Sequence, residues 1–341
     1  SNGPAVESHS HAFGVNNVTI KGAVSQTLTE SVKKEALSLG FDTVGIATAD
    51  RADGFLFYQD WLARGMHAGM DYLIRYADLR GDVGRLLPGT QSVIAVTLAY
   101  RQPEPMASEV KIAQYARGRD YHRVLRNKLK KLAIRLDVLV PGHRHRACVD
   151  SAPILEREYA HRAGLGWFGK NTMLIDSRRG SWFFIGILLT TLPLDADRPA
   201  HGGCGTCHAC VDACPTGAIV QFEGRWQVDA RTCISYLTIE HRGQFTTDQA
   251  AQVGDWTFGC DVCQDVCPFN QARASQPLRA SPTREADLRP SRTWPDLETV
   301  ANMSYEEWDR LTEGSAVRRA GFEGLRRNAR ANLRNRHEGS R

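Results

Sequence analysis

The residues best suited to chemistry in this chain are its cysteines, eight of which lie between positions 204 and 267. The first run has the spacing CxxCxxCxxxCP, and the second has CxxCxxxCP with one further cysteine well ahead of it. Thiolates at such spacings hold [4Fe–4S] clusters, and the last cysteine of each run ligates the other cluster. The spacing therefore predicts two clusters, with the ligand sets Cys204, Cys207, Cys210 and Cys267, and Cys214, Cys233, Cys260 and Cys263.

Structural zinc and disulfides are the alternative uses of these cysteines. Zinc sites usually come as two CxxC pairs separated by a dozen or more residues, and disulfides stabilise small secreted domains. This chain has 341 residues and shows no secretory signal. The pattern favours iron–sulfur clusters in a domain of the two-cluster ferredoxin type. Because Cys233 is remote in sequence from its fellow ligands, residues 234–259 are expected to loop out between them.

The composition is that of a globular protein, with 42% hydrophobic residues, 24% charged residues and a net charge of +5. The longest apolar run, 182–189, is shorter than the roughly 20 residues of a membrane span and predicts a buried strand. Residues 1–22 are polar and are expected to form a disordered leader, not a targeting signal. Reduced cysteines without an export signal predict a cytoplasmic protein. We expect a monomer without membrane contacts.

Ahead of the cysteines lies a long segment in which strands and helices alternate. Helices are expected at 25–40 and 121–140, and strands at 41–47, at 92–100 and directly before Asp150. One face of the helix 121–140 carries the apolar residues Leu125, Leu129, Leu132, Leu136 and Leu139, and its basic residues lie opposite. The fold class predicted is α+β, with an α/β-type domain over 23–195, a cluster domain over 196–275, and a connector with a short basic helical tail over 276–341.

A second polar stretch, residues 148–171, is a candidate site for the chemistry that consumes the electrons. Asp150 follows a strand, where functional residues commonly lie, and a partly desolvated carboxylic acid there could have a raised pKa and donate a proton. The alternative is that Asp150 only caps a helix over 153–163. The segment 115–122 is a further polar and aromatic cluster, in which Asp120 is the expected helix cap.

The sequence contains neither a GxGxxG nor a GxxxxGK[ST] phosphate-binding pattern, and the glycines of 164–171 do not have that spacing. It offers no basis for direct binding of a nicotinamide cofactor or a nucleoside triphosphate. We therefore expect the electrons to arrive from another protein through the clusters.

Several separate motifs together resemble the epoxyqueuosine reductase family. They are YARGRDYHRVLRNKLKKL, VDSAPILEREYAHRAGLGWFGKNTMLI, the first cysteine run with PTGAI, VDARTCISYLTIE, FGCDVCQDVCPFN and TEGSAVRR, and the similarity extends from about residue 30 to 335. The resemblance implies a base-off cobalamin on a first domain like that of reductive dehalogenases. It also implies reduction of the epoxide of epoxyqueuosine at the tRNA wobble position, the last step of queuosine biosynthesis. Many members continue into further helical repeats, for which this sequence leaves no room, so the extent of tRNA contact stays open.

The resemblance also assigns roles to residues. It implies that Asp150 is the proton donor and that Tyr115, His122, Lys170 and Asn171 contact the corrin. The partners it implies are the tRNA anticodon stem-loop and an electron donor such as a flavodoxin or a ferredoxin. Two alternatives stay open: a cobalamin-dependent reductive dehalogenase acting on a small molecule, and a simple ferredoxin-type electron carrier.

The C-terminal segment from Arg310 onward has a large excess of arginine over glutamate and contains no aspartate. Its arginines recur at helical spacings, and such a one-signed charge suits a phosphate backbone. The hypothesis is that this tail and the basic face of the helix 121–140 hold the anticodon stem-loop through Arg318, Arg319, Arg326, Arg327, Arg330 and Arg334.

Overall fold

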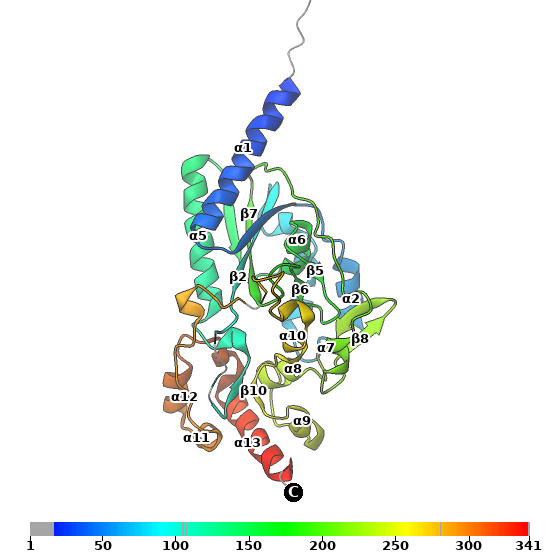
Figure 1. The fold of residues 1–341 in the computed structure, drawn as a ribbon, viewed down its shortest axis with the longest axis vertical. Coiled ribbons are helices and arrows are strands. Elements are labelled where there is room, and N and C mark those ends of the chain that lie inside the picture. The colour runs from blue at the N-terminus through cyan, green and yellow to red at the C-terminus, as the bar shows by residue number, and fades with distance from the viewer. Residues whose placement is uncertain (1–16, 104–105, 107, 280, 340–341) are drawn as a thin grey trace, which may run out of the picture.

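A four-stranded antiparallel sheet is the centre of the first part of the chain in a computed structural model, which describes residues 17–103, 106, 108–279 and 281–339 (Figure 1). The strand order is β1-β2-β7-β4. The central strands β2 (Ser92–Ala99) and β7 (Phe183–Thr190) pair along their whole length. β1 (Thr43–Thr48) and β4 (His145–Cys148) form the edges. β2 is buried at all but its last position, as its continuous apolar sequence predicts.

Helices cover both faces of this sheet. α1 (Asn17–Ser38) and α5 (Tyr121–Leu139) pack on the side chains of Ile94, Val96 and Leu98 from one face of β2. α2 (Phe55–Ala63) and α6 (Glu156–Arg162) pack on Val93 and Ala95 from the other. This alternation along one strand is the two-residue period of a sheet buried on both sides. The α+β expectation is confirmed.

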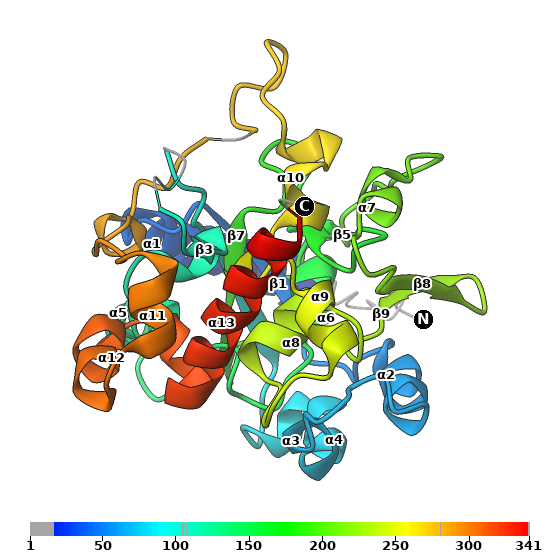
Figure 2. The same ribbon diagram turned by 90° about the horizontal axis from the view of Figure 1, so that it is seen from below.

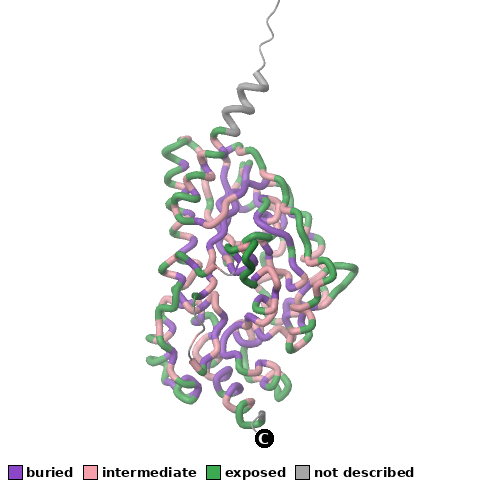
Figure 3. The backbone as a smooth tube through the Cα atoms, in the orientation of Figure 1, coloured by how far each residue is buried: buried purple, intermediate pink, exposed green. Residues whose placement is uncertain are grey.

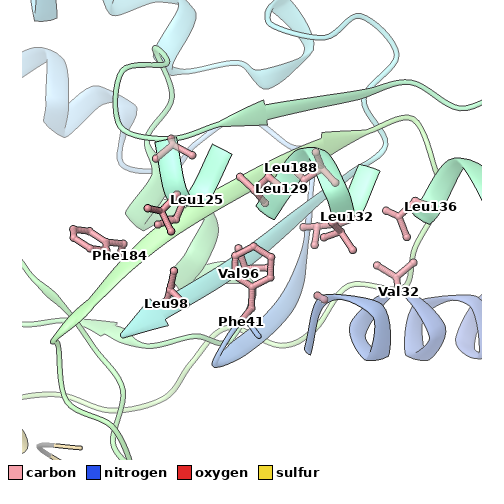
Figure 4. Packing of buried hydrophobic residues seen from close by; sticks show 14 of the residues in the cluster. Val32, Phe41, Val96, Leu98, Leu125, Leu129, Leu132, Leu136, Phe184 and Leu188 are labelled. Atoms are coloured by element: carbon pink, nitrogen blue, oxygen red, sulfur yellow. The ribbon is translucent and has the colours of Figure 1, made fainter. Parts of the chain in front are cut away.

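The apolar stripe of α5 is the main cover of one sheet face (Figure 4). Leu125, Leu129, Leu132 and Leu136 are fully buried against the strands. Leu139, predicted to continue the stripe, is 45% exposed at the last residue of the helix. On the opposite face α6 lies very close to β1. A Cβ at Gly45 would stand 2.0 Å from the carbonyl oxygen of Ala163, so only glycine fits there.

Two helix boundaries differ from those expected from the sequence. α1 begins at Asn17, earlier than the expected 25, and the predicted disordered leader over 1–22 lies mostly outside the described residues. α6 begins at Glu156 with Leu155 as its N-cap, so the alternative role of Asp150 as the cap of this helix is wrong. The region 55–80 is helical, in the pieces α2, α3 (Tyr72–Arg75) and α4 (Ala77–Arg80). In the described part of the chain, no helix combines the length and apolarity of a membrane span.

The cysteine-bearing part consists of short elements joined by loops, most of them visible from below in Figure 2. They are the helices α7 (Ala209–Asp212), α8 (Ile234–Ile239), α9 (Thr247–Gln252) and α10 (Val262–Asp265), the hairpin β8 (Ile219–Phe222) and β9 (Arg225–Val228), and β10 (Trp256–Phe258). One small pairing ties this part to the first, because β10 runs parallel to β3 (Lys111–Ile112). Within the first part, β5 (Trp167–Phe168) pairs with β6 (Leu174–Ile175). The expectation that 234–259 loops out is wrong. These residues form α8, α9 and β10, which all pack on the last helix.

The C-terminal segment is a packed helical layer and not a short tail. It contains α11 (Leu297–Asn302), α12 (Tyr305–Thr312), a 3₁₀ turn over Ala316–Ala320 and α13 (Gly321–Gly339). Its apolar residues share one cluster with Val110 and Phe258. Figure 3 shows buried backbone continuing from the sheet into this layer. The segment therefore completes the fold.

Most arginines of this layer have partners within the protein. Arg327 is only 6% exposed and donates to the carbonyl oxygens of Leu237, His241 and Gly243 at 3.0, 3.1 and 2.8 Å. Arg326 and Arg330 donate to the carbonyl of Ala301, Arg318 pairs with Asp309, and Arg319 pairs with Glu240. The hypothesis that the whole arginine run binds tRNA is thus wrong for Arg327, and most of the others are engaged in holding the layer together.

Removal of the Arg327 side chain should destabilise the protein, because three carbonyl groups of the 234–259 region lose their charged donor. We expect Arg327→Ala to lower the free energy of unfolding by about 3 kcal/mol. Thermal unfolding of the anaerobically reconstituted protein measures this. Arg334→Ala, an exposed position on the same helix, is the matched control and should leave the midpoint unchanged. Equal midpoints for the two variants would contradict a structural role for Arg327.

Candidate functional site

Asp150 lies just beyond the end of β4 and has an unusual backbone conformation. Its φ is +50°, in the left-handed region that residues other than glycine rarely adopt. Its backbone N–H donates to the carboxylate of Glu156 in the first turn of α6. Such backbone strain persists only where neighbouring groups enforce it. The contact with Glu156 therefore helps to hold the Asp150 side chain toward the start of α5.

The carboxylate of Asp150 contacts two side chains of α5. Its Oδ2 accepts a hydrogen bond from the Tyr121 hydroxyl at 3.0 Å and lies 2.9 Å from Nε2 of His122. The other ring nitrogen of His122, Nδ1, lies 2.6 Å from Asp120 Oδ1. Asp120 is the N-cap of α5, as the sequence predicted, and accepts from the His122 backbone N–H at 3.0 Å. His122 is thus held between two carboxylates.

These contacts decide where the proton resides. Burial lowers the pKa of His122, but its bonds to Asp120 and Asp150 and their charges outweigh this and raise it to about 9. Burial raises the pKa of Asp150, but the hydrogen bonds and charge of His122 outweigh burial, and the pKa ends below its ordinary value. The Asp150 side chain is 60% exposed, so water further weakens the effect of burial. The sequence-based expectation of a raised pKa at Asp150 is wrong: at neutral pH the proton is on His122.

Glu156 behaves in the opposite way. Burial and the charge of Asp150 raise its pKa to about 8. Two neighbouring carboxyl groups cannot both ionise at low cost. Asp150 ionises, because it is paired with the imidazolium of His122. Glu156 is therefore the neutral acid of the pair, and Asp150 the carboxylate.

Three residues from remote parts of the chain complete the surroundings of Asp150. Arg319 donates twice to Glu240, at 2.8 and 3.0 Å, and its guanidinium lies 5.4 Å from the centre of the Tyr72 ring. The positive charge of Arg319 also lowers the pKa of Asp150. Sequence reasoning treated Arg319 only as part of a basic tail and missed Tyr72 and Glu240. The available signal was that Arg319 and Glu240 lie in two of the motifs quoted above.

The first predicted cysteine set lines one small cavity. Cys204, Cys207, Cys210 and Cys267 share its wall with Ile175 and Phe269. Burial, then the neighbouring Cys204, Cys267 and Cys207, raise the pKa of the Cys210 thiol to about 11. Cys267 therefore approaches the cysteines of the first run, as the crossed ligation rule requires.

The second set gathers in the same crossed way. Burial raises the pKa of Cys260 to about 12, and the sulfurs that raise it further are Cys233 and Cys214. Within the described residues, no group of three or more His, Cys, Asp and Glu side chains is arranged to hold a single metal ion. The eight thiols gather as four at each of two places, which is the grouping that a pair of [4Fe–4S] clusters requires. The ninth cysteine, Cys148, is 1% exposed and is a buried apolar thiol, as expected.

Of the predicted corrin contacts, the structure brings two together with Asp150 and places two elsewhere. His122 contacts Asp150 directly, and the Tyr115 ring centre lies 6.0 Å from that of Tyr121. Lys170 and Asn171 instead line the cavity of the first cysteine set. Asn171 is buried there and donates to the carbonyl of Cys263 at 3.0 Å.

Tyr115 connects the second cysteine set with the Asp150 site. It packs in one cluster with Cys260, Ile234 and Trp256, and its own ring faces Tyr121. The described residues thus place the second set on the side of Asp150. An electron arriving at that set is separated from the proton-bearing network by aromatic side chains.

Comparisons with known proteins agree with this arrangement. The family model described as "4Fe-4S double cluster binding domain" matches residues 203–270, and that described as "Epoxyqueuosine reductase QueG, DUF1730" matches 80–151. The chain is 44% identical to an epoxyqueuosine reductase of Gloeobacter violaceus over 89% of this chain and 94% of the relative. It is 41% identical to that of Vibrio cholerae over 89% and 82%. A solved epoxyqueuosine reductase in complex with an epoxyqueuosine-modified tRNA-Tyr stem loop is 28% identical, covers 92% of this chain and 83% of its own, and has a TM-score of 0.80.

Loss of one cysteine should damage one cluster only. We expect about eight irons per chain after anaerobic reconstitution of the unchanged protein. Cys233→Ala should lose the spectroscopic signal of the second cluster and retain that of the first, while Cys148→Ala, the matched control, keeps both. Stoichiometric zinc without iron-dependent absorbance would contradict the cluster assignment.

The ion pair of His122 should make stability depend on pH. The folded-state pKa of about 9 lies above the ordinary value of 6.5, so the stabilisation is complete below about pH 6.5 and is lost as the pH rises through 9. We expect the melting temperature of the unchanged protein to approach that of His122→Gln over this interval. Parallel curves for the two proteins across it would show that no imidazolium is held there.

Proposed function

The chain belongs to the epoxyqueuosine reductase family, and we propose that it reduces the epoxide of epoxyqueuosine at the wobble position of tRNA to the alkene of queuosine. The observation that carries this proposal is the solvent-facing Asp150, backed by a protonated His122, beside a pair of four-cysteine sites. A simple electron carrier would have no use for such a proton-bearing network. The relatives named above support the choice of substrate.

The overall reaction consumes two electrons and two protons. Both carbon–oxygen bonds of the epoxide break, a carbon–carbon double bond forms, and the oxygen leaves as water. The two clusters pass electrons singly, and the protons come from the protein and solvent. We propose cobalamin as the group that receives these electrons: when bound, it supplies a low-valent cobalt that can transfer them to an epoxide carbon.

The residues around Asp150 fit a corrin. The carboxylate is exposed to solvent, and near it lie the packed rings of Tyr115, Tyr121 and Phe184 and the pair of Tyr72 with Arg319. Flat rings and an arginine suit a wide macrocycle with amide side chains. Tyr115 and His122 are the proposed contacts. Lys170 and Asn171, which line the first cluster cavity, are proposed to contact the neighbouring cofactors from that side.

Asp150 is proposed to deliver the proton to the epoxide oxygen, and His122 to supply it. As the oxygen gains charge, it becomes a far stronger base than a carboxylate, so transfer through Asp150 is favourable. The proton passes from His122 to Asp150 along the 2.9 Å contact and from Asp150 to the epoxide oxygen, and Asp120 stabilises the imidazolium beforehand. The Tyr121 hydroxyl keeps Asp150 Oδ2 oriented throughout.

The proposed partners are the tRNA anticodon stem-loop and an external electron-donor protein, with the cytoplasm as the place where they meet. The exposed face of α5 begins at the catalytic network and carries Arg123, Arg126 and Lys130. Arg126 also donates to the hydroxyl of Ser151, next to Asp150. A phosphate backbone lying along this face would bring an unpaired base to Asp150.

Replacement of the proposed acid should abolish chemistry and not assembly. We expect Asp150→Asn to retain iron content and cobalamin uptake and to lose about 10²–10⁴-fold in the rate of epoxide loss from tRNA, because an amide cannot relay the proton. Asp137→Asn, an exposed carboxylate on the far end of α5, is the matched control. A loss below about fivefold for Asp150→Asn would reject it as the proton donor.

A further inference from the structure

We propose that an arginine-rich face beside the first cluster is the docking surface for an acidic protein that donates single electrons. This inference rests on the proposed function, which requires electrons from outside. The docking surface consists of Arg101, Arg178, Arg179, Arg273, Arg279 and Arg284, from the end of β2, the loop before β7 and the segment after α10.

The two cysteine sets differ in the segments that surround them. In the first run, Gly203, Gly205, Thr206 and His208 are all exposed, so the cofactor held there lies under a thin, open loop. The second set lies among Ile234, Trp256 and Tyr115, on the side of Asp150. Electrons therefore enter at the first set and leave from the second, and a donor must reach the first.

The arginines are held in place relative to the first set. Arg279 is 8% exposed and donates through two nitrogens to the Ser177 carbonyl at 3.0 and 2.8 Å. Its guanidinium lies 4.7 Å from the centre of the Phe269 ring, two residues beyond the ligand Cys267. Gly180, at φ +81°, packs so closely on Asn270 that an added Cβ would stand 2.2 Å from its Oδ1. The segment 177–181 thus packs tightly on the turn that follows Cys267.

A cavity of about 310 Å³ opens in the same surface. Arg101, Arg179 and Arg284 line it together with the apolar side chains of Trp182 and Leu278. Asp42 is its one carboxylate; it lies 3.8 Å from Arg179 and 3.3 Å from Arg284 and accepts from the Ala99 backbone N–H. Arg284 keeps 84% of its side chain exposed. The cavity has the shape and charge to receive a carboxylate side chain with an apolar stem.

The charge of the whole surface has one dominant sign. The carboxylates near the arginines include Asp42, Asp176, Asp265 and Glu285. Asp176 is engaged by the backbone N–H groups of residues 178 and 179, and Glu285 pairs with Lys128. The excess of arginines leaves a positive face, to which an acidic protein is attracted and steered.

The position of this surface favours a protein donor over tRNA. In Figure 2 the projecting segment after α10 lies on the opposite side of the molecule from α3 and α4, and α3 carries Tyr72 of the Asp150 site. An RNA must bring its base to Asp150 and so approaches from that other side. A donor has to come near the first cluster, which is where the arginines are.

The electron count sets the chemistry of the donor. Each encounter oxidises the donor by one electron and reduces the first cluster by one electron, and two encounters supply the two electrons that one epoxide consumes. A flavin-bearing or iron–sulfur protein can give single electrons in this way. Flavodoxin, an acidic protein with a bound flavin, is a suitable probe.

The test measures binding of flavodoxin to the reconstituted protein at low ionic strength. We expect Arg178→Glu with Arg284→Glu to raise the Kd at least about tenfold, and the difference to shrink at high salt because the charges are exposed. Arg178→Glu alone, at an exposed position, should raise the Kd by a smaller factor. This single variant still tests the docking surface if the double variant misfolds. The charge-matched control is Arg310→Glu with Arg334→Glu, both exposed on the C-terminal layer.

A chemical reductant separates this inference from the proposed function. With it, the double variant should turn over as fast as the unchanged protein, while flavodoxin-driven turnover falls at low donor concentration. Failure of the unchanged protein with the chemical reductant would refute the proposed function and not the docking site. An unchanged Kd for flavodoxin in the double variant, or a loss of tRNA affinity in its place, would overturn the docking surface.

Discussion

The crossed grouping of the eight cysteine thiols is the constraint on which the rest of the structure depends. Cys214 and Cys267 each belong to a group of sulfurs whose other members lie in the other run, so neither half can form its site alone. The chain between Cys214 and Cys267 must therefore return to the cysteine sites. It does so through α8, α9 and β10, which pack on α13. The C-terminal layer, with its buried Arg327, is therefore part of what holds the second set against Tyr115 and the Asp150 site.

At that site, one proton is shared among groups that restrain one another. Asp120 caps α5 and holds His122, His122 and Tyr121 hold the Asp150 carboxylate, and Glu156 holds its strained backbone. This arrangement keeps Asp150 ionised and exposed, and the proton resides on His122, one hydrogen bond away. Such a pair can protonate a strongly basic oxygen, and solvent at the exposed site can then supply the next proton.

Local patterns predicted much of this. Cysteine spacing predicted the two ligand sets, the alternation of strands and helices predicted the sheet and α5, and the residue type before α5 predicted Asp120 as its cap. Each of these patterns depends on neighbours in sequence. Tertiary packing determined the rest. The end of an apolar stripe depends on where the helix stops, and Leu139 is exposed at the last residue of α5. The pKa of Asp150 depends on His122, and the burial of Arg327 depends on carbonyl groups about ninety residues away. Lys170 and Asn171 lie beside cysteines instead of the aspartate because their loop crosses to the cluster side.

The most direct test of the account is mass spectrometry of nucleosides from epoxyqueuosine-containing tRNA. The tRNA is incubated anaerobically with the reconstituted protein, cobalamin and a chemical reductant, and then digested. The account predicts conversion of epoxyqueuosine to queuosine, with the loss of one oxygen atom, only when iron–sulfur clusters and cobalamin are both present. Unchanged epoxyqueuosine in the complete mixture, or full conversion without cobalamin, would contradict it.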